Sequence, residues 1–295
     1  MNEQPSMEKL VEQITRMVVQ DPAVRQAYAL RAPADSAGIK RPPAGGVRAP
    51  AGAPDDGVNI AARDPDELAR MKAKTNARIG VGKAGPRLRT STLLRLRADH
   101  ASARDAVRTD VDQSVLDALG LPTVQTLCRD KNEFLTRPDL GRQFSPQAVE
   151  AIRAATDAAP DVLIYASDGL SSTAVAANLP DILPVLTDSL RAKGIRVGRP
   201  FFVKYGRVGA MDPISEATGA QVTCVLIGER PGLATAKSMS AYIAYRATVG
   251  MPEARRTVVS NIHDAGTAAV EAGAYIADVI ESMLREKKSG TELRK

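Results

Sequence analysis

Apolar residues recur along the chain in two spacing patterns, which predict different structures near its two ends. Near the N-terminus, six apolar residues at helical spacing form one stripe: Met7, Leu10, Val11, Ile14, Met17 and Val18. Residues 31–57 are rich in Ala, Pro and Gly without an apolar period, so they predict a flexible linker. The helix over residues 7–18 is either a frayed end or a docking element, and the tether behind it favours docking.

Residues 63–150 combine helical patterns with many arginines. The sequence DPDE at residues 64–67 has the capping Asp, first-turn Pro and Glu of a helix start, and it predicts a helix to about residue 78. The glycines of GVGKAG, residues 80–85, fit G-x-G-x-x-G, but the dinucleotide-binding version must follow a strand and this one follows a helix. We therefore expect a Gly-rich turn before a basic helix over residues 91–107. Its arginines form either a solvated face with ion pairs or a protein–protein surface.

From about residue 160, short apolar runs alternate with helical patterns. The runs cover residues 161–166, 201–205, 222–227 and 256–259. A helix to about residue 193, interrupted near Pro180 and Pro184, follows the first run, and a last helix covers residues 267–287. This alternation predicts an α/β fold with a mostly parallel sheet and helices on both faces.

Each predicted strand ends in a turn of glycine and polar residues: SDGLS, YGRV, GERPG and SNIHDAG. In parallel sheets the ligand crevice lies outside the carboxyl ends of the strands, so we expect these turns to line one rim. In GERPG, Gly228 and Gly232 predict a close approach of something large to the backbone. The small residues that follow predict the start of a helix.

Composition narrows the function classes. The 295 residues carry 40 Lys and Arg against 34 Asp and Glu, a net charge of +6, which raises nucleic acid as a partner. However, the chain has no Trp, six Tyr and four Phe, and no DNA-reading motif, so we expect no nucleic-acid binding. No run of about 18 apolar residues predicts a membrane span. The dispersed Cys128, Cys224, His100 and His263 predict no zinc site and a reducing cytoplasm.

No convincing catalytic set occupies the predicted rim. Ser167, Asp168 and His263 could form a nucleophilic triad, although nothing in their spacing requires it. Asp168 and Glu229 could instead form a carboxylate pair for acid–base chemistry. We predict no catalytic residue in this chain. A self-sufficient enzyme that uses Asp168, Glu229 and His263, and a basic binding module without a cofactor, remain the alternatives.

One loop nearly matches a cobalt-ligating motif. Asn261, His263 and Gly266 differ at one position from the D-x-H-x-x-G loop by which some cobalamin enzymes ligate cobalt through His. The missing Asp would orient the imidazole and raise its basicity, so ligation is not favoured.

Seven stretches from about residue 77 onward resemble the small (light) subunit of adenosylcobalamin-dependent ethanolamine ammonia-lyase. They are RIGVGKAGPRLRT, LRADHASARDAV, NEFLTRPDLGR, VLIYASDGLS, GRPFFVKYGRV, VLIGERPGL and SNIHDAGT, in the family's order. The resemblance implies a Rossmann-like domain and a separate large catalytic subunit, with adenosylcobalamin held between the two chains. It also implies that the complex deaminates ethanolamine, and similar vicinal amino alcohols, by radical chemistry that yields acetaldehyde and ammonia from ethanolamine. We expect no activity from this chain alone.

The family's cobalamin contacts map onto Val208 of GRV, Glu229 of GERPG and Val258, two residues before SNIH. A family member with Cys at the last position has a thiol there, so Val258 can offer a backbone or van der Waals contact. The Glu229 carboxylate suits the amide N–H groups at the rim of a corrin. The family holds cobalamin with its own benzimidazole on cobalt, so His263 is not needed as a ligand.

The resemblance also sets the expected organisation and location. We expect an amphipathic helix over residues 1–20, a linker over 21–62, a subunit-contact region over 63–150 and a cobalamin-contacting α/β domain over 151–295. In pattern, residues 7–18 resemble the tethered helices of enzymes packaged into bacterial microcompartments. This implies docking on a microcompartment shell in the bacterial cytoplasm, in those organisms that build the compartment.

Overall fold

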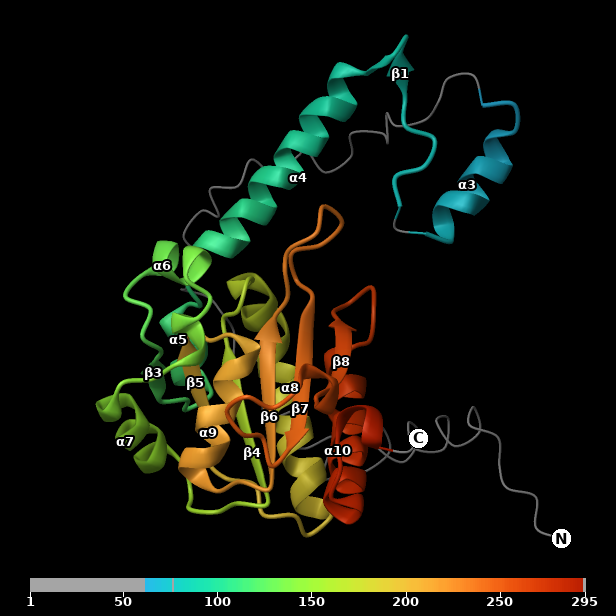
Figure 1. Ribbon diagram of the computed structural model, residues 1–295. Coiled ribbons are helices and arrows are strands. Elements are labelled where there is room, and N and C mark those ends of the chain that lie inside the picture. Colours follow the sequence, from blue (N-terminus) through green and yellow to red (C-terminus); the bar gives the residue numbers. More distant parts are fainter. Residues whose placement is uncertain (1–61, 76, 294–295) are drawn as a thin grey trace, which may run out of the picture. The chain divides into compact units, whose positions relative to one another are not determined.

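The computed structural model describes residues 62–75 and 77–293, all within one compact unit, Gly52–Lys295 (Figure 1). The architecture is α/β, with a six-stranded sheet and helices on both of its faces. The helix expected over residues 7–18 and nearly all of the linker expected over 21–62 lie outside the described residues.

The sheet is mixed, with the strand order β3-β5-β4-β6-β7-β8. Its strands are β3 (Thr123–Gln125), β4 (Val162–Ser167), β5 (Phe201–Lys204), β6 (Val222–Gly228), β7 (Met239–Tyr245) and β8 (Thr257–Ile262). The first four strands in this order are parallel, whereas β7 is antiparallel to both of its neighbours. Because β8 is antiparallel to β7, it points the same way as β6. All four predicted strands are therefore present, and their carboxyl ends share one edge.

The strand β7 corrects the prediction for the chain after GERPG. Residues 229–238 form a loop rather than the start of a helix, and the chain then returns along β6 as β7. Nearly every side chain of β7 is buried, so its sequence shows no alternation of apolar and polar residues. A short apolar run of this kind does not distinguish a strand from a helix.

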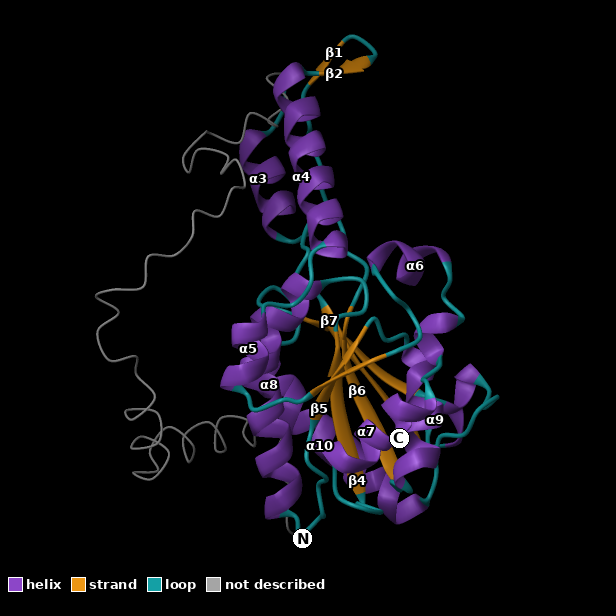
Figure 2. Cartoon of the chain, turned by 90° about the vertical axis from the view of Figure 1, so that its left-hand side faces the viewer, coloured by secondary structure: helices purple, strands orange, loops and turns teal. Residues whose placement is uncertain are grey.

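Two helical layers cover the sheet. On one face, α8 (Ser172–Ala192) and α10 (Ala269–Glu286) pack against one apolar cluster. On the other face, α7 (Pro146–Ala155) and α9 (Met211–Thr218) pack against a second cluster. Figure 2 shows α8 and α9 on opposite sides of the strands. Alternate residues of β4 and β6 belong to alternate clusters because successive side chains of a strand point to opposite faces.

The helix α8 runs without the interruption expected at its two prolines. An interior proline removes one helical hydrogen bond at a cost of about 3 kcal/mol. Pro184 has no N–H to donate to the carbonyl of Pro180, four residues earlier in the helix. Pro180 is exposed, so water can solvate that carbonyl. Ten residues of α8 are buried, and Gly273 lets the backbone of α10 approach that of α8 closely. This packing outweighs the cost of the prolines.

The described chain begins with α3 (Pro65–Ala73), a hairpin of β1 (Lys83–Ala84) and β2 (Arg87–Leu88), and α4 (Thr90–Arg108). Asp64 caps α3 as predicted, since Glu67 N donates to Asp64 Oδ1 at 2.9 Å, although the helix ends before residue 78. The G-x-G-x-x-G segment forms the Gly-rich turn expected before the basic helix, with Gly85 at a φ of 60°.

Short elements connect α4 to the sheet. They are α5 (Gln113–Ala118), α6 (Lys131–Thr136) and the 3-10 helix η1 (Leu140–Arg142). Three further 3-10 turns are η2 (Val208–Ala210), η3 (Glu253–Arg255) and η4 (Gly290–Glu292). Strand β3 lies in this part of the chain and pairs with β5, so the sheet takes one strand from the region predicted as helical. In residues 62–75 and 77–293, no helix combines the length and apolar character needed to cross a bilayer.

Candidate functional site

The loops that follow β4 and β6 interlock at the carboxyl edge of the sheet. Leu170 N donates to Gly228 O at 3.0 Å, and Gly169 adopts a left-handed φ of 52°. A Cβ added to Gly228 would collide with the carbonyl oxygens of Asp168 and Ser171. The backbone approach predicted at Gly228 is therefore made by the chain itself, which corrects the expectation that an external group requires this glycine.

A buried carboxylate, Asp168, joins the ends of β4 and β5. Its Oδ1 accepts a hydrogen bond from Tyr205 N at 2.8 Å, and its Oδ2 accepts one from Lys131 Nζ at 2.9 Å. The side chains of Asp168 and Lys131 are 2% and 12% exposed. Burial raises the pKa of Asp168, while Lys131 and the Tyr205 amide act in the opposite direction. This pair fixes the path of the chain from β5 into the GRV turn.

The residue before Val208 is held through both its backbone and its side chain. Arg207 N donates to Gly141 O at 2.8 Å, and Arg207 Nη2 donates to Phe134 O at 2.7 Å. The guanidinium carbon lies 4.1 Å from the centre of the Phe134 ring, a cation–π contact. Val208 then begins η2 and packs, half-buried, against the apolar cluster beneath α9.

On the same face, Tyr242 connects Glu229 to Val258. The Tyr242 hydroxyl donates to Glu229 Oε1 at 3.2 Å. Tyr242 lies directly opposite Val225 on β6 and Val258 on β8, so the three side chains share the face covered by α9 farther along the sheet. Val258 is 46% exposed. A half-exposed carboxylate and an exposed apolar side chain therefore flank a tyrosine.

A buried ion pair links the Val208 segment to the Val258 strand. Arg256 Nη2 donates to both carboxylate oxygens of Asp212 at 2.8 Å, and Arg256 also pairs with Glu253. Asp212 lies in the first turn of α9, just after η2, and Arg256 directly precedes β8. Burial raises the pKa of Asp212, against the opposing effect of Arg256.

The structure thus places Val208, Glu229 and Val258 on one face of the sheet. Val208 and Glu229 follow the carboxyl ends of β5 and β6, whereas Val258 lies near the start of β8, level with Val225 in the middle of β6. Val208 and Tyr242 border the same apolar cluster. Tyr242 donates a hydrogen bond to Glu229 and lies opposite Val258 in the sheet. The arrangement offers apolar contact surface and one acceptor carboxylate.

The near-motif at His263 is satisfied within its own loop. Ala265 N donates to His263 Nδ1 at 3.2 Å, so the other ring nitrogen, Nε2, carries the proton and donates to Asn261 Oδ1 at 2.8 Å. His263 is also buried. With both nitrogens engaged, the imidazole is poorly placed to ligate a metal.

The other candidate residues form no catalytic set. Ser167 Oγ donates to Val203 O at 2.8 Å, and Asp168 is held by Lys131. His263 follows β8, which β6 and β7 separate from β4, so the suggested triad is not assembled. Ser171 caps α8 by accepting from Ala174 N at 3.1 Å. These side chains stabilise the loops of the edge.

No group of three or more His, Cys, Asp or Glu side chains in the described part of the chain could hold a metal ion. Cys128 and Cys224 are both buried and free. Burial raises the pKa of Cys224 to about 12, so this thiol is not a thiolate at neutral pH.

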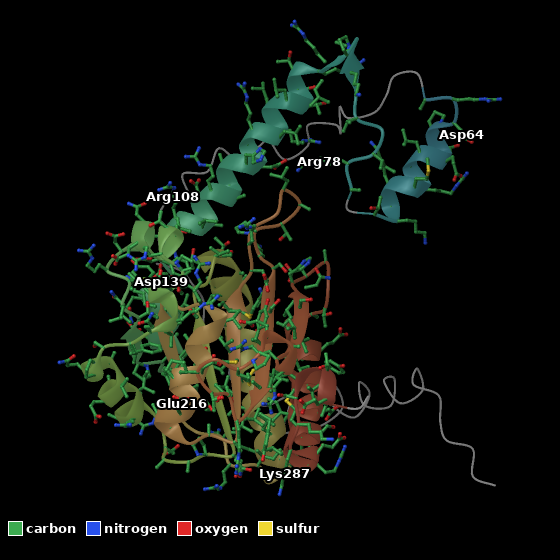
Figure 3. The ribbon with its side chains drawn as sticks, viewed as in Figure 1. Asp64, Arg78, Arg108, Asp139, Glu216 and Lys287 are labelled. Carbon is green, nitrogen blue, oxygen red and sulfur yellow. The ribbon has the colours of Figure 1, made fainter. Side chains whose placement is uncertain are left out.

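A pocket of about 320 Å³ lies beside the loop that joins β6 and β7. Its lining comes from three parts of the chain: Arg78, Arg95, Asp99, Leu233, Ala234, Thr235, His263 and Ala265. Arg78 Nη2 donates to Leu233 O at 2.8 Å and pairs with Asp99, and Figure 3 shows Arg78 beside the tip of that loop. The contact ties the segment before α4 to the β6–β7 hairpin.

Three residues that hold this arrangement together are absent from the sequence-based site: Lys131, Tyr242 and Arg256. Tyr242 could have been found only with β7, because its role depends on pairing with β6 and β8. Lys131 and Arg256 meet their partners across 37 and 44 positions of the chain. No local pattern signals such pairs.

Comparison with known proteins agrees with the resemblance read from the motifs. The family model "Ethanolamine ammonia-lyase light chain (EutC)" matches residues 65–294. The chain is 63% identical over 229 residues to an ethanolamine ammonia-lyase small subunit of Clostridium tetani, with 78% of each chain covered. It is 55% identical over 231 residues to that of Clostridium perfringens, again with 78% of each covered. For the small subunit of Clostridium acetobutylicum the identity is 54% over 229 residues, 78% of this chain and 95% of that one.

Proposed function

The chain belongs to the family of ethanolamine ammonia-lyase light chains, and from this premise we propose that it shares adenosylcobalamin with a large catalytic subunit. The complex would deaminate ethanolamine to acetaldehyde and ammonia, and would act on similar vicinal amino alcohols. The observation that carries the proposal is the placement of Val208, Glu229 and Val258 on one face of the sheet.

The residues of this face fit the edge of a corrin. Glu229 Oε1 accepts from Tyr242, whereas Oε2 has no hydrogen-bond partner among the described residues, so it can accept an amide N–H. Val258 offers exposed apolar surface on the same face, farther from the carboxyl edge than Glu229. When bound, the cofactor supplies the radical chemistry by homolysis of its cobalt–carbon bond. This chain's residues would position the corrin edge and exclude water from that side.

We further propose that the region over residues 63–150 contacts the large subunit through α4. This helix has 19 residues, of which Thr92 and Ala106 are the buried ones. Leu94 is 57% exposed and Leu93 is 40% exposed, beside several arginines. An exposed helix with leucines and guanidinium groups suits a protein–protein interface.

The proposal also covers the fold class of the α/β domain and the location of the complex in the cell. The β4–α8–β5–α9–β6 unit, with its two helices on opposite faces, supports a Rossmann-like description of the α/β domain. We place the complex in the bacterial cytoplasm. In organisms that build a microcompartment, residues 7–18 would dock on its shell.

Reconstitution tests this function. A large subunit that is active with its own small subunit is purified without it and mixed with this chain, adenosylcobalamin and ethanolamine. We expect ammonia release that requires all components, and none from this chain alone. Absence of turnover and of co-purification with such a competent large subunit would contradict the proposal. Leu94→Asp should weaken co-purification while leaving the melting temperature of the isolated chain unchanged.

A further inference from the structure

Tyr242 lies at the centre of the face that carries the three predicted contacts. Its position in β7 puts it between Val225 of β6 and Val258 of β8, each directly opposite across a strand pair. Directly opposite side chains of neighbouring antiparallel strands have Cβ atoms about 5 Å apart. Tyr242 is therefore next to Val258 and also reaches the carboxylate that follows β6.

The hydroxyl of Tyr242 restrains a side chain that is otherwise little restrained. Glu229 is the first residue after β6, and its backbone N–H donates to Ser238 O at 3.0 Å. That bond fixes the backbone, whereas Oε1 of the side chain is held by Tyr242. The tyrosine thus selects the orientation in which Oε2 stays available.

The donor role of Tyr242 is stable at neutral pH. Burial raises the pKa of Tyr242, and the neighbouring Glu229 carboxylate raises it further. The phenol therefore stays protonated and can donate only one hydrogen bond, which goes to Glu229. The ring itself packs against the apolar cluster beneath α9, so ring and hydroxyl have separate partners.

We propose that Tyr242 is a positioning residue for adenosylcobalamin, which acts by holding the Glu229 carboxylate toward the corrin edge. This inference rests on the proposed function. An unrestrained carboxylate must be ordered when the cofactor binds, and such ordering weakens binding by roughly five-fold. Removal of the hydroxyl should therefore reduce cofactor affinity without changing the chemistry.

The test uses the reconstituted complex with Tyr242→Phe, which keeps the ring and removes the hydroxyl. We expect the apparent KM for adenosylcobalamin to rise about five-fold, with kcat at saturating cofactor and the KM for ethanolamine unchanged. An absorbance titration with hydroxocobalamin gives a second readout that does not need turnover, and we expect the same weakening there.

A matched control removes another hydroxyl from the same apolar cluster. Tyr165 is fully buried, and its hydroxyl has no hydrogen-bond partner among the described residues. Tyr165→Phe should leave unchanged both the apparent KM for adenosylcobalamin and the affinity for hydroxocobalamin. If Tyr242→Phe behaves like Tyr165→Phe, the inference is wrong.

A double mutant distinguishes positioning from an independent contact. If Tyr242 acts through Glu229, then Tyr242→Phe combined with Glu229→Ala should bind cofactor as weakly as Glu229→Ala alone. Fully additive losses would overturn the positioning role. If Glu229→Ala weakens cofactor binding and Tyr242→Phe does not, the inference fails while the proposed function stands. If neither change affects binding, Glu229 does not belong to the site and the inference falls with it.

Discussion

The two halves of the carboxyl edge hold their carboxylates in opposite ways. In the covered half, at the ends of β4 and β5, Asp168 is buried and both of its oxygens are bound by the chain itself. In the open half, formed by β6, β7 and β8, Glu229 uses one oxygen for Tyr242 beside the exposed Val258. A fully bound group stabilises a fold, whereas a partly bound group can still accept a ligand.

This difference has a cause in the layers of the sheet. The helices α7 and α9 cover β4, β5 and β6 on one face, and their side chains belong to the same apolar cluster as those strands. On the same face of β8, Val258 lies outside this cluster and is 46% exposed. The position of α9 therefore decides which residues near the edge stay open. Four predictions test this contrast, and the change expected to cost the most stability comes first.

Removal of the buried carboxylate should have the largest effect on stability. Asp168→Ala leaves the Lys131 ammonium largely buried without its partner and leaves Tyr205 N without an acceptor. We expect the free energy of unfolding to fall by about 3 kcal/mol, as for other broken buried pairs. Urea unfolding of the isolated chain measures this. Asp188→Ala, at an exposed position with a long contact to Arg191, should change it by less than about 0.5 kcal/mol.

The ion pair between α9 and β8 should give the next largest effect. Asp212→Asn removes a charge that binds Arg256 in a bidentate manner, but Arg256 keeps Glu253. We expect a loss of about 2 kcal/mol in the free energy of unfolding. The pair links the segments that carry Val208 and Val258. The affinity of the reconstituted complex for the cofactor, measured by titration, should therefore also fall. An unchanged titration would mean that this pair does not organise the open half.

In the open half, Glu229→Ala should separate binding from stability. We expect the free energy of unfolding to change by less than about 0.5 kcal/mol, because Glu229 is half-exposed and bound by one phenol. The apparent KM for adenosylcobalamin should rise roughly ten-fold, as for the loss of a hydrogen bond to a charged group. Glu150→Ala, at an exposed glutamate of α7, should change neither quantity. Equal losses of stability in Glu229→Ala and Asp168→Ala would remove the contrast between the two halves.

The pH dependence of stability should be the smallest effect. Burial raises the pKa of Asp168 above its unfolded value, so the folded state favours the protonated carboxyl. The stability from this group is fully present below the unfolded pKa and is lost as the pH rises through the folded pKa. The free energy of unfolding of the wild-type chain should therefore exceed that of Asp168→Asn by more at pH 4 than at pH 7, as urea unfolding at the two pH values would measure. If this difference in the free energy of unfolding grows toward pH 7, the attraction of Lys131 lowers the pKa of Asp168 by more than burial raises it.

The local features of this protein could be predicted from its amino-acid sequence. The apolar runs predicted β4, β5 and β6, because a strand buried on both faces needs consecutive apolar residues. The run at residues 256–259 also located β8, although most of that strand is exposed or only partly buried. Asp64 and its neighbours fixed the start of α3 through a cap that lies within one turn. The seven motif stretches identified the family, which the family model and the curated relatives confirm.

The fold, in contrast, set every feature that depends on contacts between distant segments. It placed β7 between β6 and β8, put the chain's own backbone against Gly228, and joined Asp168 to Lys131 and Arg256 to Asp212. It also aligned Tyr242 with Glu229 and Val258. These contacts are set by strand pairing and helix layers rather than by neighbouring residues. Consequently a sequence pattern can name the residues of an edge, but the packing determines which of them the protein leaves open.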